Sequence, residues 1–359
     1  MINTRLKWFL EKNQLINKFQ FGFRQNHNTI DHLYRLKEEI QFSLENKNST
    51  IAVALDYTKA FDLVWRDGLL VKMMSLNIRG KIINWIKHFL NNRNNIIKIE
   101  NVTSNPYCLD NGIPQGSSLS PTLFLIMIND FPSLSTYTSQ SLFADDANIW
   151  RSGTNLKQIS FHLQEDLIEI DKWSSNWGFI INKEKTTATI FTNKNNTDSI
   201  SLKLKGHQIN IQNKFKFLGI TFDKNLTWKY HIEDLVDKST QILNIMKSFH
   251  GLSWGATNKT LLTIYKSLLG SRIDYGCFIL GDACKTNLKM LDTIQYKALC
   301  IVLGAPKGTS LAALLAETGE TSLQIRRDLM LMKFLMKLKA NTNNVTNETL
   351  KNKKYYKFK

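Results

Sequence analysis

The fold of this chain is decided by the stretch Ser141–Trp150, SLFADDANIW. Two adjacent acids lie between short apolar runs, and such runs bounded by turn-forming residues are typical of strands. Because aspartate tolerates tight-turn backbone, the pattern predicts a β-hairpin with Asp145 and Asp146 at its tip. Two carboxylates held together repel each other unless a cation neutralises them, so the tip is either a solvated turn or part of a metal site.

The composition indicates a globular protein with a polyanionic partner. The chain has 359 residues, and its 43% of hydrophobic residues exclude wholesale disorder. A formal net charge of +17 favours nucleic acid or an acidic membrane surface as the partner. No apolar run approaches the roughly 20 residues that span a bilayer, and the first ten residues do not resemble a secretion signal. Nucleic acid is therefore the expected partner, and no membrane is.

The cysteines and histidines do not form a metal-binding motif. None of the four cysteines has C-x-x-C spacing, which argues against a zinc site and a disulfide framework. The seven histidines are scattered and show no H-E-x-x-H motif. A metal bound here would have carboxylate ligands, which favours Mg²⁺ over zinc.

The chain before residue 224 mixes helices and strands. The continuous apolar run Ile51–Leu55 predicts a strand buried on both faces, which ends at Asp56. Ser120 followed by Pro121 predicts a helix N-cap and first turn. Further helices are predicted at 1–18, from Thr29, and at 66–77, 80–91 and 154–176, with Gly178 as a C-cap. Further strands are predicted at 19–24, 95–102, 179–181, 187–192, on both sides of Gly206 and at 215–222.

The chain changes character after Asp223. Helical periodicity covers 228–249, 257–270, 286–303 and 321–340, and strand patterns become scarce. We therefore predict a domain boundary near residue 224. The last segment, 341–359, is basic and rich in asparagine, and we expect it to lack stable order.

Three carboxylates are expected to converge at one end of the sheet. If the strand that ends at Asp56 pairs beside the hairpin, Asp56 joins Asp145 and Asp146. Two unit charges about 4 Å apart repel by roughly 4 kcal/mol at an effective dielectric of 20. Mg²⁺ relieves such repulsion, and a pair of ions can activate an attacking hydroxyl and stabilise a leaving pyrophosphate. The expected reaction is nucleotidyl transfer, in which a 3′-hydroxyl attacks the α-phosphate of a nucleoside triphosphate.

Six segments, taken in order, resemble the motifs of reverse transcriptases of non-LTR (LINE-type) retrotransposons, and most closely those of the insect jockey-type elements. The matching segments are Gln20–Arg24 (QFGFR), Ala54–Asp62 (ALDYTKAFD), Gly112–Pro121 (GIPQGSSLSP), Phe143–Asp146 (FADD), Asn176–Thr186 and Lys216–Ile220 (KFLGI). The resemblance implies an α+β right-hand polymerase. Its partial fingers and palm would occupy 1–223, and a mostly helical thumb and C-terminal region would occupy 224–340.

The resemblance also implies roles for individual residues. Asp56, Asp145 and Asp146 match the catalytic acids that hold two Mg²⁺ ions, or Mn²⁺ as an alternative. The backbone carbonyl of Tyr57 would be a further ligand. Lys185 matches the lysine that protonates pyrophosphate, and Lys183 is close enough in sequence to compete for that role.

Other matches concern the nucleotide and the primer. Phe61 matches the aromatic gate that excludes ribose, although a core phenylalanine has the same pattern. Arg24 matches the residue that contacts the triphosphate, although an ordinary surface arginine would also fit. Gln115 and Gly116 match the turn that lines the nucleotide pocket, where glycine allows a close approach. The primer grip would comprise Lys216, Phe217, Leu218 and Gly219, a stretch that also suits a plain edge strand.

The expected function is therefore RNA-directed DNA polymerisation with an RNA template, a DNA primer and dNTPs, in the nucleus where target-primed integration occurs. Relatives have a preceding fingers segment and an upstream endonuclease that are not found here, so we expect an N-terminally truncated copy. The polar residues after Arg24, 25–28, also replace basic ones in relatives and are expected to weaken the triphosphate contact. Two alternatives stay open: a non-catalytic remnant that binds nucleic acid, and a template-independent nucleotidyl transferase.

Overall fold

The computed structural model describes residues 1–91, 93–194, 200–250 and 255–347. It contains two compact units. The first unit comprises 1–32 and 43–212, and the second comprises 33–42 and 213–359. Helix α2 (Thr29–Glu45) contributes residues to both units.

A five-stranded sheet forms the centre of the first unit, with the strand order β11-β8-β1-β7-β6. The middle strand β1 is antiparallel to both β7 and β8, while β6 and β7 form a hairpin and β11 runs parallel to β8. Ile51, Ala52 and Val53 of β1 have no exposed surface, which confirms the prediction of a strand buried on both faces. The strands are β1 (Ser49–Leu55), β6 (Thr138–Phe143), β7 (Asp146–Gly153), β8 (Thr187–Phe191) and β11 (Asn210–Ile211).

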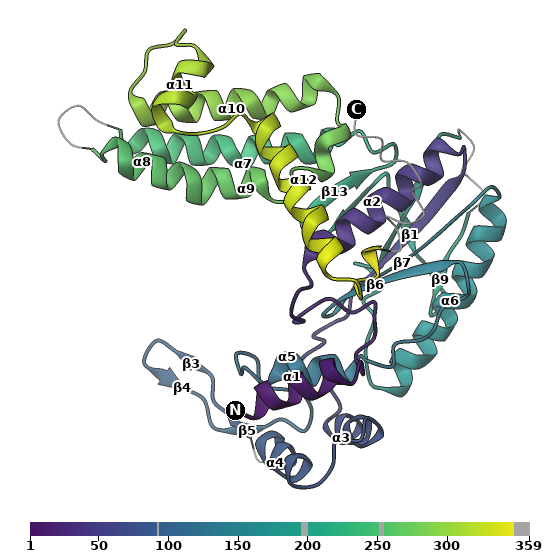
Figure 1. The fold of residues 1–359 in the computed structure, drawn as a ribbon. Coiled ribbons are helices and arrows are strands. Elements are labelled where there is room, and N and C mark those ends of the chain that lie inside the picture. The colour runs from purple at the N-terminus through teal and green to yellow at the C-terminus, as the bar shows by residue number, and fades with distance from the viewer. Residues whose placement is uncertain (92, 195–199, 251–254, 348–359) are drawn as a thin grey trace. The chain divides into compact units, whose positions relative to one another are not determined.

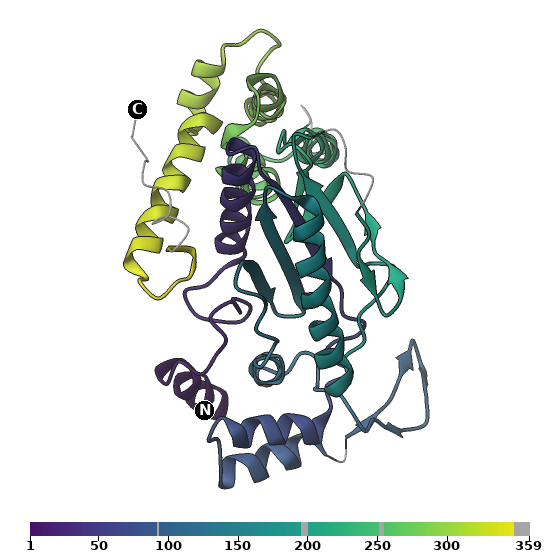
Figure 2. The same cartoon turned by 90° about the vertical axis from the view of Figure 1, so that its right-hand side faces the viewer.

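Helices cover the sheet and extend the core of the first unit. Helix α6 (Leu156–Asn176) contacts β1 and β7 and lies across the strands in Figure 2. It ends at Trp177, and Gly178 has φ +75°, which agrees with the predicted C-cap. Helix α5 (Ser120–Met127) packs against two others, α1 (Ile2–Lys12) and α3 (Arg66–Ser75), and α4 (Lys81–Leu90) follows α3 (Figure 1). The predicted helices are therefore present, with α1 ending earlier than expected.

Several local predictions for the first unit are wrong. Ser120 is not a cap, because its hydroxyl donates to the carbonyl of Pro114 at 2.6 Å and the N-cap position falls on Leu119. Phe19–Arg24 is not a strand and forms one isolated bridge, from Gln20 to Leu142. Instead of one strand, residues 94–108 form two short ladders, which pair β2 (Asn94–Asn95) with β5 (Tyr107–Cys108) and β3 (Lys98–Ile99) with β4 (Val102–Thr103).

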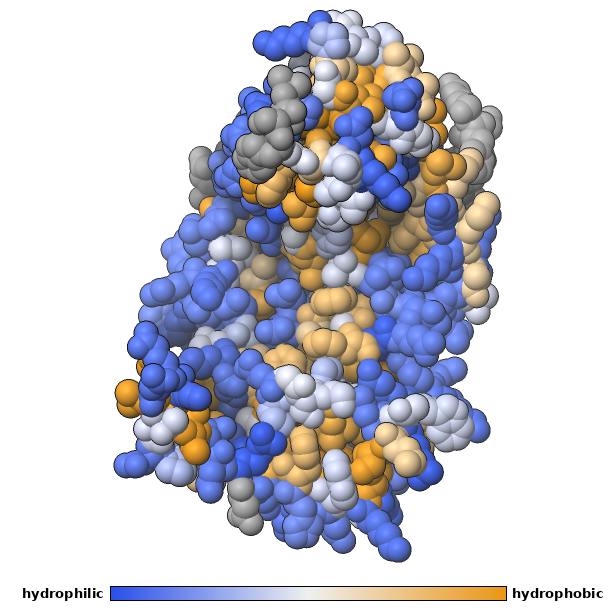
Figure 3. Space-filling model, turned by 90° about the vertical axis from the view of Figure 1, so that its left-hand side faces the viewer, coloured by the Kyte–Doolittle hydropathy of each residue, from blue (hydrophilic) through white to orange (hydrophobic). Residues whose placement is uncertain are grey.

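These short ladders leave large apolar side chains exposed to solvent. Ile99 is 69% exposed and Val102 is 73% exposed. Figure 3 shows apolar side chains reaching the surface in patches separated by polar ones.

After its segment 33–42 of α2, the second unit has a β-hairpin that is followed by helices. The hairpin pairs β12 (Lys214–Phe217) with β13 (Ile220–Asp223), so the predicted single strand 215–222 is wrong. The chain turns at Leu218 and Gly219, which both have positive φ, 42° and 86°. The helices are α7 (Lys229–Ser248), α8 (Asn258–Ile264), a π-helical stretch (Tyr265–Gly270), α9 (Ser271–Asp274), α10 (Lys285–Leu303), α11 (Leu311–Thr318) and α12 (Leu323–Ala340). In Figure 1, α7 and α10 run beside each other and α12 runs at a steep angle to them.

The helical periodicity predicted α7, α8, α10 and α12, but α11 was missed. The predicted tail begins at 341, and its residues 348–359 lie outside the described part of the chain. Asn344, Val345 and Thr346, by contrast, are buried. Among the helices of the described residues, none is long and apolar enough to cross a membrane.

Candidate active site

The pairing of β1 with β7 brings Asp56 next to the acidic hairpin. Leu55 lies opposite Ala147, so continuing the antiparallel register by one residue sets Asp56 opposite Asp146. Phe143 pairs with Asp146 at the end of the β6–β7 hairpin. The convergence predicted from the sequence is therefore present at one end of the sheet.

The hairpin turn consists of two residues, Ala144 and Asp145. Asp146 is the first residue of β7, so the tip is one residue earlier than predicted. Ala144 has φ +55°, a value that alanine adopts only when its surroundings hold it there. The turn therefore fixes the place from which the carboxylate of Asp145 projects.

The electrostatics of the three acids show that they interact. Desolvation and, after it, the like charges of Asp145 and Asp56 together raise the pKa of Asp146 to about 6. Asp146 is exposed at the end of the sheet, where the like charges of Asp145 and Asp56 act on its carboxylate. The site therefore carries an excess of negative charge that a cation would neutralise.

The acids as they stand do not complete a metal site. In the described ranges of the chain, no group of three or more His, Cys, Asp or Glu side chains is arranged to hold a metal ion. Mg²⁺, however, is usually bound by one or two carboxylates together with water and substrate phosphates. An all-oxygen donor set with a raised carboxylate pKa fits such an ion, with the remaining ligands supplied by substrate.

The end of β1 is anchored by a turn that follows Ile181. The amide of Asn182 donates to the carbonyl of Asp56 at 2.7 Å, and the amide of Asp56 contacts the hydroxyl of Thr186 at 3.4 Å. Tyr57 forms an isolated bridge with Ile181, and its buried hydroxyl lies 3.2 Å from that of Ser174. Desolvation raises the pKa of the Tyr57 phenol, so the ring serves as a neutral anchor. Backbone hydrogen bonds thus position Asp56 without using its carboxylate.

The sequence model of the family described as "Reverse transcriptase (RNA-dependent DNA polymerase)" matches residues 1–222, which include all three acids. The chain belongs to the reverse transcriptase family. This confirms the family that the six motifs indicated.

Individual relatives come from mobile elements of insects. The chain is 31% identical to the RNA-directed DNA polymerase from mobile element jockey of Drosophila melanogaster, over 85% of this chain and 34% of the relative. It is 28% identical to the probable RNA-directed DNA polymerase from transposon BS of the same species, over 87% of this chain and 35% of that one. The chain therefore spans about a third of the length of these relatives.

Among solved structures, apo telomerase from Candida tropicalis matches with a TM-score of 0.50 and 14% identity, over 97% of this chain and 55% of that one. At this identity the likeness concerns the fold alone. It confirms the predicted α+β polymerase fold for this reverse transcriptase.

Hydrogen bonds join the segment that follows β1 to the segment that precedes α5. The amide of Ile113 donates to the carbonyl of Phe61 at 3.0 Å, and the amide of Gln115 donates from its side chain to Asp62 at 3.0 Å. A Cβ on Gly112 would lie 2.7 Å from the carbonyl oxygen of Asp62, so glycine is required for this close approach. Gln115 and Gly116 are exposed, as residues that face a nucleotide must be.

Phe61 is half-buried and held by other rings. It stacks on Phe124 with a centroid distance of 4.4 Å, and the exposed Phe23 meets it edge-on at 6.3 Å. Phe124 also lies edge-on to Phe179 at 6.3 Å. Stacking on a fully buried ring fixes the orientation of Phe61, as a gate against the ribose hydroxyl would require.

Arg24 has partners that the sequence did not predict. Its guanidinium makes a bidentate pair with Glu11, with both distances 2.9 Å, and donates to the carbonyls of Asn17 and Gln20. Only 11% of its side chain is exposed. The structure thus gives Arg24 a role in fastening α1 to the turn after it, and its contact with a triphosphate stays a prediction.

The remaining predicted residues lie in or next to two turns. Lys183 and Lys185 are both exposed on the turn anchored by Asn182, whose side chain accepts from the amide of Lys185 at 3.2 Å. Of the predicted primer grip, Lys216 and the buried Phe217 end β12, and Leu218 and Gly219 form the turn to β13 in the second unit. There the hydroxyl of Tyr275 donates to the carbonyl of Leu218 at 2.6 Å.

One residue near the acids was missed. Gln20 is buried and bonds to the hairpin turn at Ala144, yet the sequence assigned it no role. The only signal was its place at the start of the QFGFR motif.

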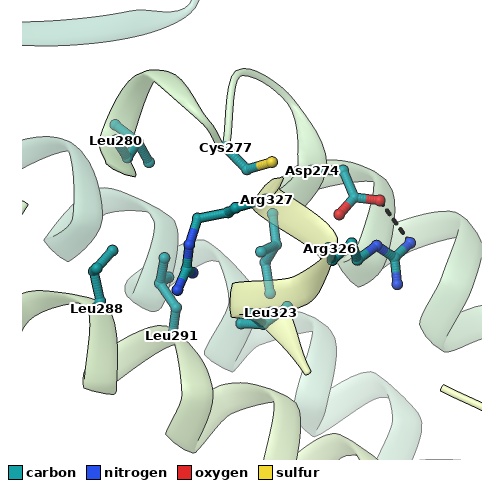
Figure 4. A pocket seen from close by; sticks show the side chains of 9 residues that line it. Asp274, Cys277, Leu280, Leu288, Leu291, Leu323, Arg326 and Arg327 are labelled. Atoms are coloured by element: carbon teal, nitrogen blue, oxygen red, sulfur yellow. Dashed lines mark hydrogen bonds and ion pairs between the residues drawn. The ribbon is translucent and has the colours of Figure 1, made fainter. Parts of the chain in front are cut away.

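A cavity in the second unit is structural. Figure 4 shows it lined mainly by leucines, with Cys277 and the ion pair of Arg326 with Asp274 at 2.6 Å. Desolvation raises the pKa of the Cys277 thiol to about 11, which leaves it protonated and unreactive at neutral pH. We assign this cavity to the helical core.

Replacing Asp146 by asparagine is expected to raise the free energy of unfolding of the metal-free protein at pH 7.5 by about 1 kcal/mol. The folded-state pKa of about 6 lies above the ordinary value of 3.8. Wild type therefore loses stability as the pH rises between these two values, and asparagine does not. Urea unfolding in EDTA at pH 3.5 and pH 7.5 measures the difference, with the exposed Asp67→Asn as the control. If the free energy of unfolding changed equally with pH in wild type and in Asp146→Asn, the repulsion among the three carboxylates would be contradicted.

Proposed function

We propose that this chain is the catalytic core of an RNA-directed DNA polymerase of a non-LTR retrotransposon, which extends a DNA primer with dNTPs on an RNA template. The observation that carries the proposal is the register that sets Asp56 opposite Asp146, beside the turn at Asp145. The family match supports the same chemistry.

The residues have distinct parts in this proposal. Asp56, Asp145 and Asp146, with the backbone carbonyl of Tyr57, would hold Mg²⁺ ions. Bound there, two such ions lower the pKa of the attacking 3′-hydroxyl and neutralise the leaving pyrophosphate. The hydrogen bonds of the Asp56 backbone and the strained turn at Ala144 keep the carboxylates in place before substrate arrives.

Other residues handle substrate. The exposed Gln115 and Gly116 would border the nucleotide, and Phe61 would exclude a ribose. Lys183 and Lys185 lie on the same turn, and either ammonium group could donate a proton to the leaving pyrophosphate. We assign this role to Lys185, because Lys185 matches the lysine of the family motif. The turn 216–219 would contact the primer backbone, with phosphate contacts that carry no sequence information. The net charge of +17 supports binding of both strands.

An extension assay on a primed homopolymer RNA tests the proposal. Purified wild type is expected to incorporate dNTPs only when template, primer and Mg²⁺ are all present. Salt-dependent RNA binding without incorporation would show a non-catalytic remnant, and extension without template would show a template-independent transferase. Either result would overturn the proposal.

Phe61→Val is expected to lower discrimination against ribonucleotides about 10- to 100-fold, since steric exclusion in an apolar pocket is worth this much. The measurement is the ratio of kcat/KM for a dNTP to that for the matching rNTP. Phe161→Val, at a phenylalanine of α6 that is 61% exposed, is the control. An unchanged ratio in Phe61→Val would identify Phe61 as an ordinary core residue.

Arg24→Gln and Glu11→Gln are each expected to lower the free energy of unfolding by about 1–3 kcal/mol, because each breaks a bidentate, partly buried ion pair. Arg24→Gln alone is expected to raise the KM for dNTPs, through the triphosphate contact. Urea unfolding and steady-state kinetics separate the two effects. Equal KM values in both variants would show that Arg24 is structural only.

A further inference from the structure

The segment Phe19–Gly22 runs beside the acidic hairpin of the first unit. The amide of Phe21 donates to the carbonyl of Leu142 at 2.9 Å, and the amide of Leu142 donates to the carbonyl of Phe19 at 3.0 Å. Leu142 lies on β6, shortly before the turn. The backbone of this segment therefore extends the pairing of β6 up to the turn residues.

The side chain of Gln20 continues this pairing onto the turn itself. It is 1% exposed, and its Oε1 accepts from the amides of Ala144 at 3.0 Å and Gly22 at 2.8 Å. Its Nε2 donates to the carbonyl of Ala144 at 3.2 Å. A side-chain amide carries an acceptor and a donor, so it can satisfy both backbone groups of one residue. Gln20 does this for the residue that precedes Asp145.

Gly22 gives the segment room to approach the turn, so that Gln20 can form its hydrogen bonds to Ala144. We call these hydrogen bonds the clamp. A Cβ at this position would lie 2.3 Å from the amide nitrogen of Ala144 and 3.0 Å from Oε1 of Gln20. The first of these atoms is backbone and cannot rotate away. Any side chain at Gly22 would therefore displace either the segment or the turn.

We propose that Gln20 and Gly22 are positioning residues for the catalytic acids, which hold the turn at Ala144 so that Asp145 and Asp146 stay beside Asp56. This inference rests on the proposed function. Repulsion among the three carboxylates would drive the turn away from Asp56 in the absence of metal. The two hydrogen bonds between the side chain of Gln20 and the backbone of Ala144 oppose this movement. They therefore keep the acids in position to bind metal.

A matched control exists in the same unit. The side chain of Gln164 on α6 also bonds both backbone groups of one residue, Lys203, with distances of 2.9 and 2.7 Å. Lys203 lies on β9 (Lys203–Leu204), which pairs with β10 (His207–Gln208) in a separate two-stranded sheet and not in the sheet that carries the acids. Gln164→Met therefore removes the same kind of clamp without touching the hairpin.

The first measurement needs neither metal nor activity. Amide hydrogen exchange of the peptide that contains 142–146 is recorded in EDTA for wild type, Gln20→Met and Gln164→Met. Gln20→Met is expected to speed exchange there at least tenfold, and Gln164→Met is expected to leave it unchanged. If Gln20→Met does not fold, Gln20→Asn, which keeps the amide on a shorter stem, replaces it. Unchanged exchange in the Gln20 variant would overturn the clamp, whatever the chain catalyses.

The second measurement separates positioning from plain structural support. In Gln20→Met, the affinity for Mn²⁺ and the kcat are each expected to fall about 10- to 100-fold, as for other residues that orient metal ligands. Electron paramagnetic resonance measures the Mn²⁺ affinity. The KM for dNTPs is expected to stay within about twofold, because the clamp does not face the nucleotide. Gly22→Ala is expected to act in the same way as Gln20→Met.

If faster exchange leaves Mn²⁺ affinity and kcat at the wild-type values, Gln20 only supports the fold and the proposal is overturned. If wild type shows no incorporation, the proposed function fails while hydrogen exchange and Mn²⁺ binding still decide the clamp.

Discussion

Asp145→Asn is expected to reduce the kcat for dNTP incorporation by about 10³-fold or more, while the free energy of unfolding stays within about 0.5 kcal/mol of wild type. Asp145 lies on the turn itself, next to Asp146, which the register sets opposite Asp56 at the end of β1. Asparagine keeps the shape of the side chain and removes the charge that would hold a divalent ion. Single-turnover extension of a primed RNA template measures the loss.

The control is Asp67→Asn, which makes the same change at an exposed position in the first turn of α3. It should retain wild-type incorporation. Full activity of Asp145→Asn would contradict the proposed mechanism, because no two-metal site could tolerate the loss of that charge. Equal loss of activity in both variants would point to impaired folding.

Phe124→Ala is expected to lower the free energy of unfolding by about 3–5 kcal/mol, the usual cost of deleting a fully buried phenylalanine. Phe124 has no exposed surface and lies between Phe61 and Phe179. Its loss would open a cavity behind Phe61, so the gate would also lose its support. Discrimination against ribonucleotides should therefore fall in any fraction of the variant that remains folded.

Urea unfolding followed by tryptophan fluorescence measures this cost. Phe161→Ala, at an exposed position of the same unit, should change the free energy of unfolding by less than about 0.5 kcal/mol. Phe124→Leu should cost less than Phe124→Ala, since it leaves a smaller cavity. A loss below about 1 kcal/mol in Phe124→Ala would show that the aromatic cluster can collapse into the space.

The parts of this protein that the sequence predicted are those with strong local patterns. The apolar run 51–55 indicated a central strand, and the two acids between apolar runs indicated the hairpin. Together they predicted that Asp56, Asp145 and Asp146 converge, because a buried strand and an adjacent hairpin belong to one sheet. The register then aligned Asp56 with Asp146, a detail that periodicity alone does not specify.

Other features depended on contacts between distant residues. Gln20 and Ala144 are separated by 124 positions, and nothing in the local pattern of either indicates the other. The pairing of Arg24 with Glu11 likewise depends on where α1 ends. The turn within 215–222 was missed because Leu218, at φ 42°, is a residue that seldom adopts such a conformation. Tertiary packing decided each of these cases.

Because α2 contributes residues to both units, part of this helix is synthesised long before the residues that it contacts in the second unit. Tyr34, synthesised early, packs against Phe278 and Phe334, and Lys37 pairs with Asp282, all of which leave the ribosome much later. Until then these contacts of α2 cannot form. A nascent or cleaved chain that ends near residue 223 would present this part of α2 to solvent, as a target for chaperones and proteases. Complete synthesis of the second unit is therefore a condition for the stability of a helix near the start of the chain.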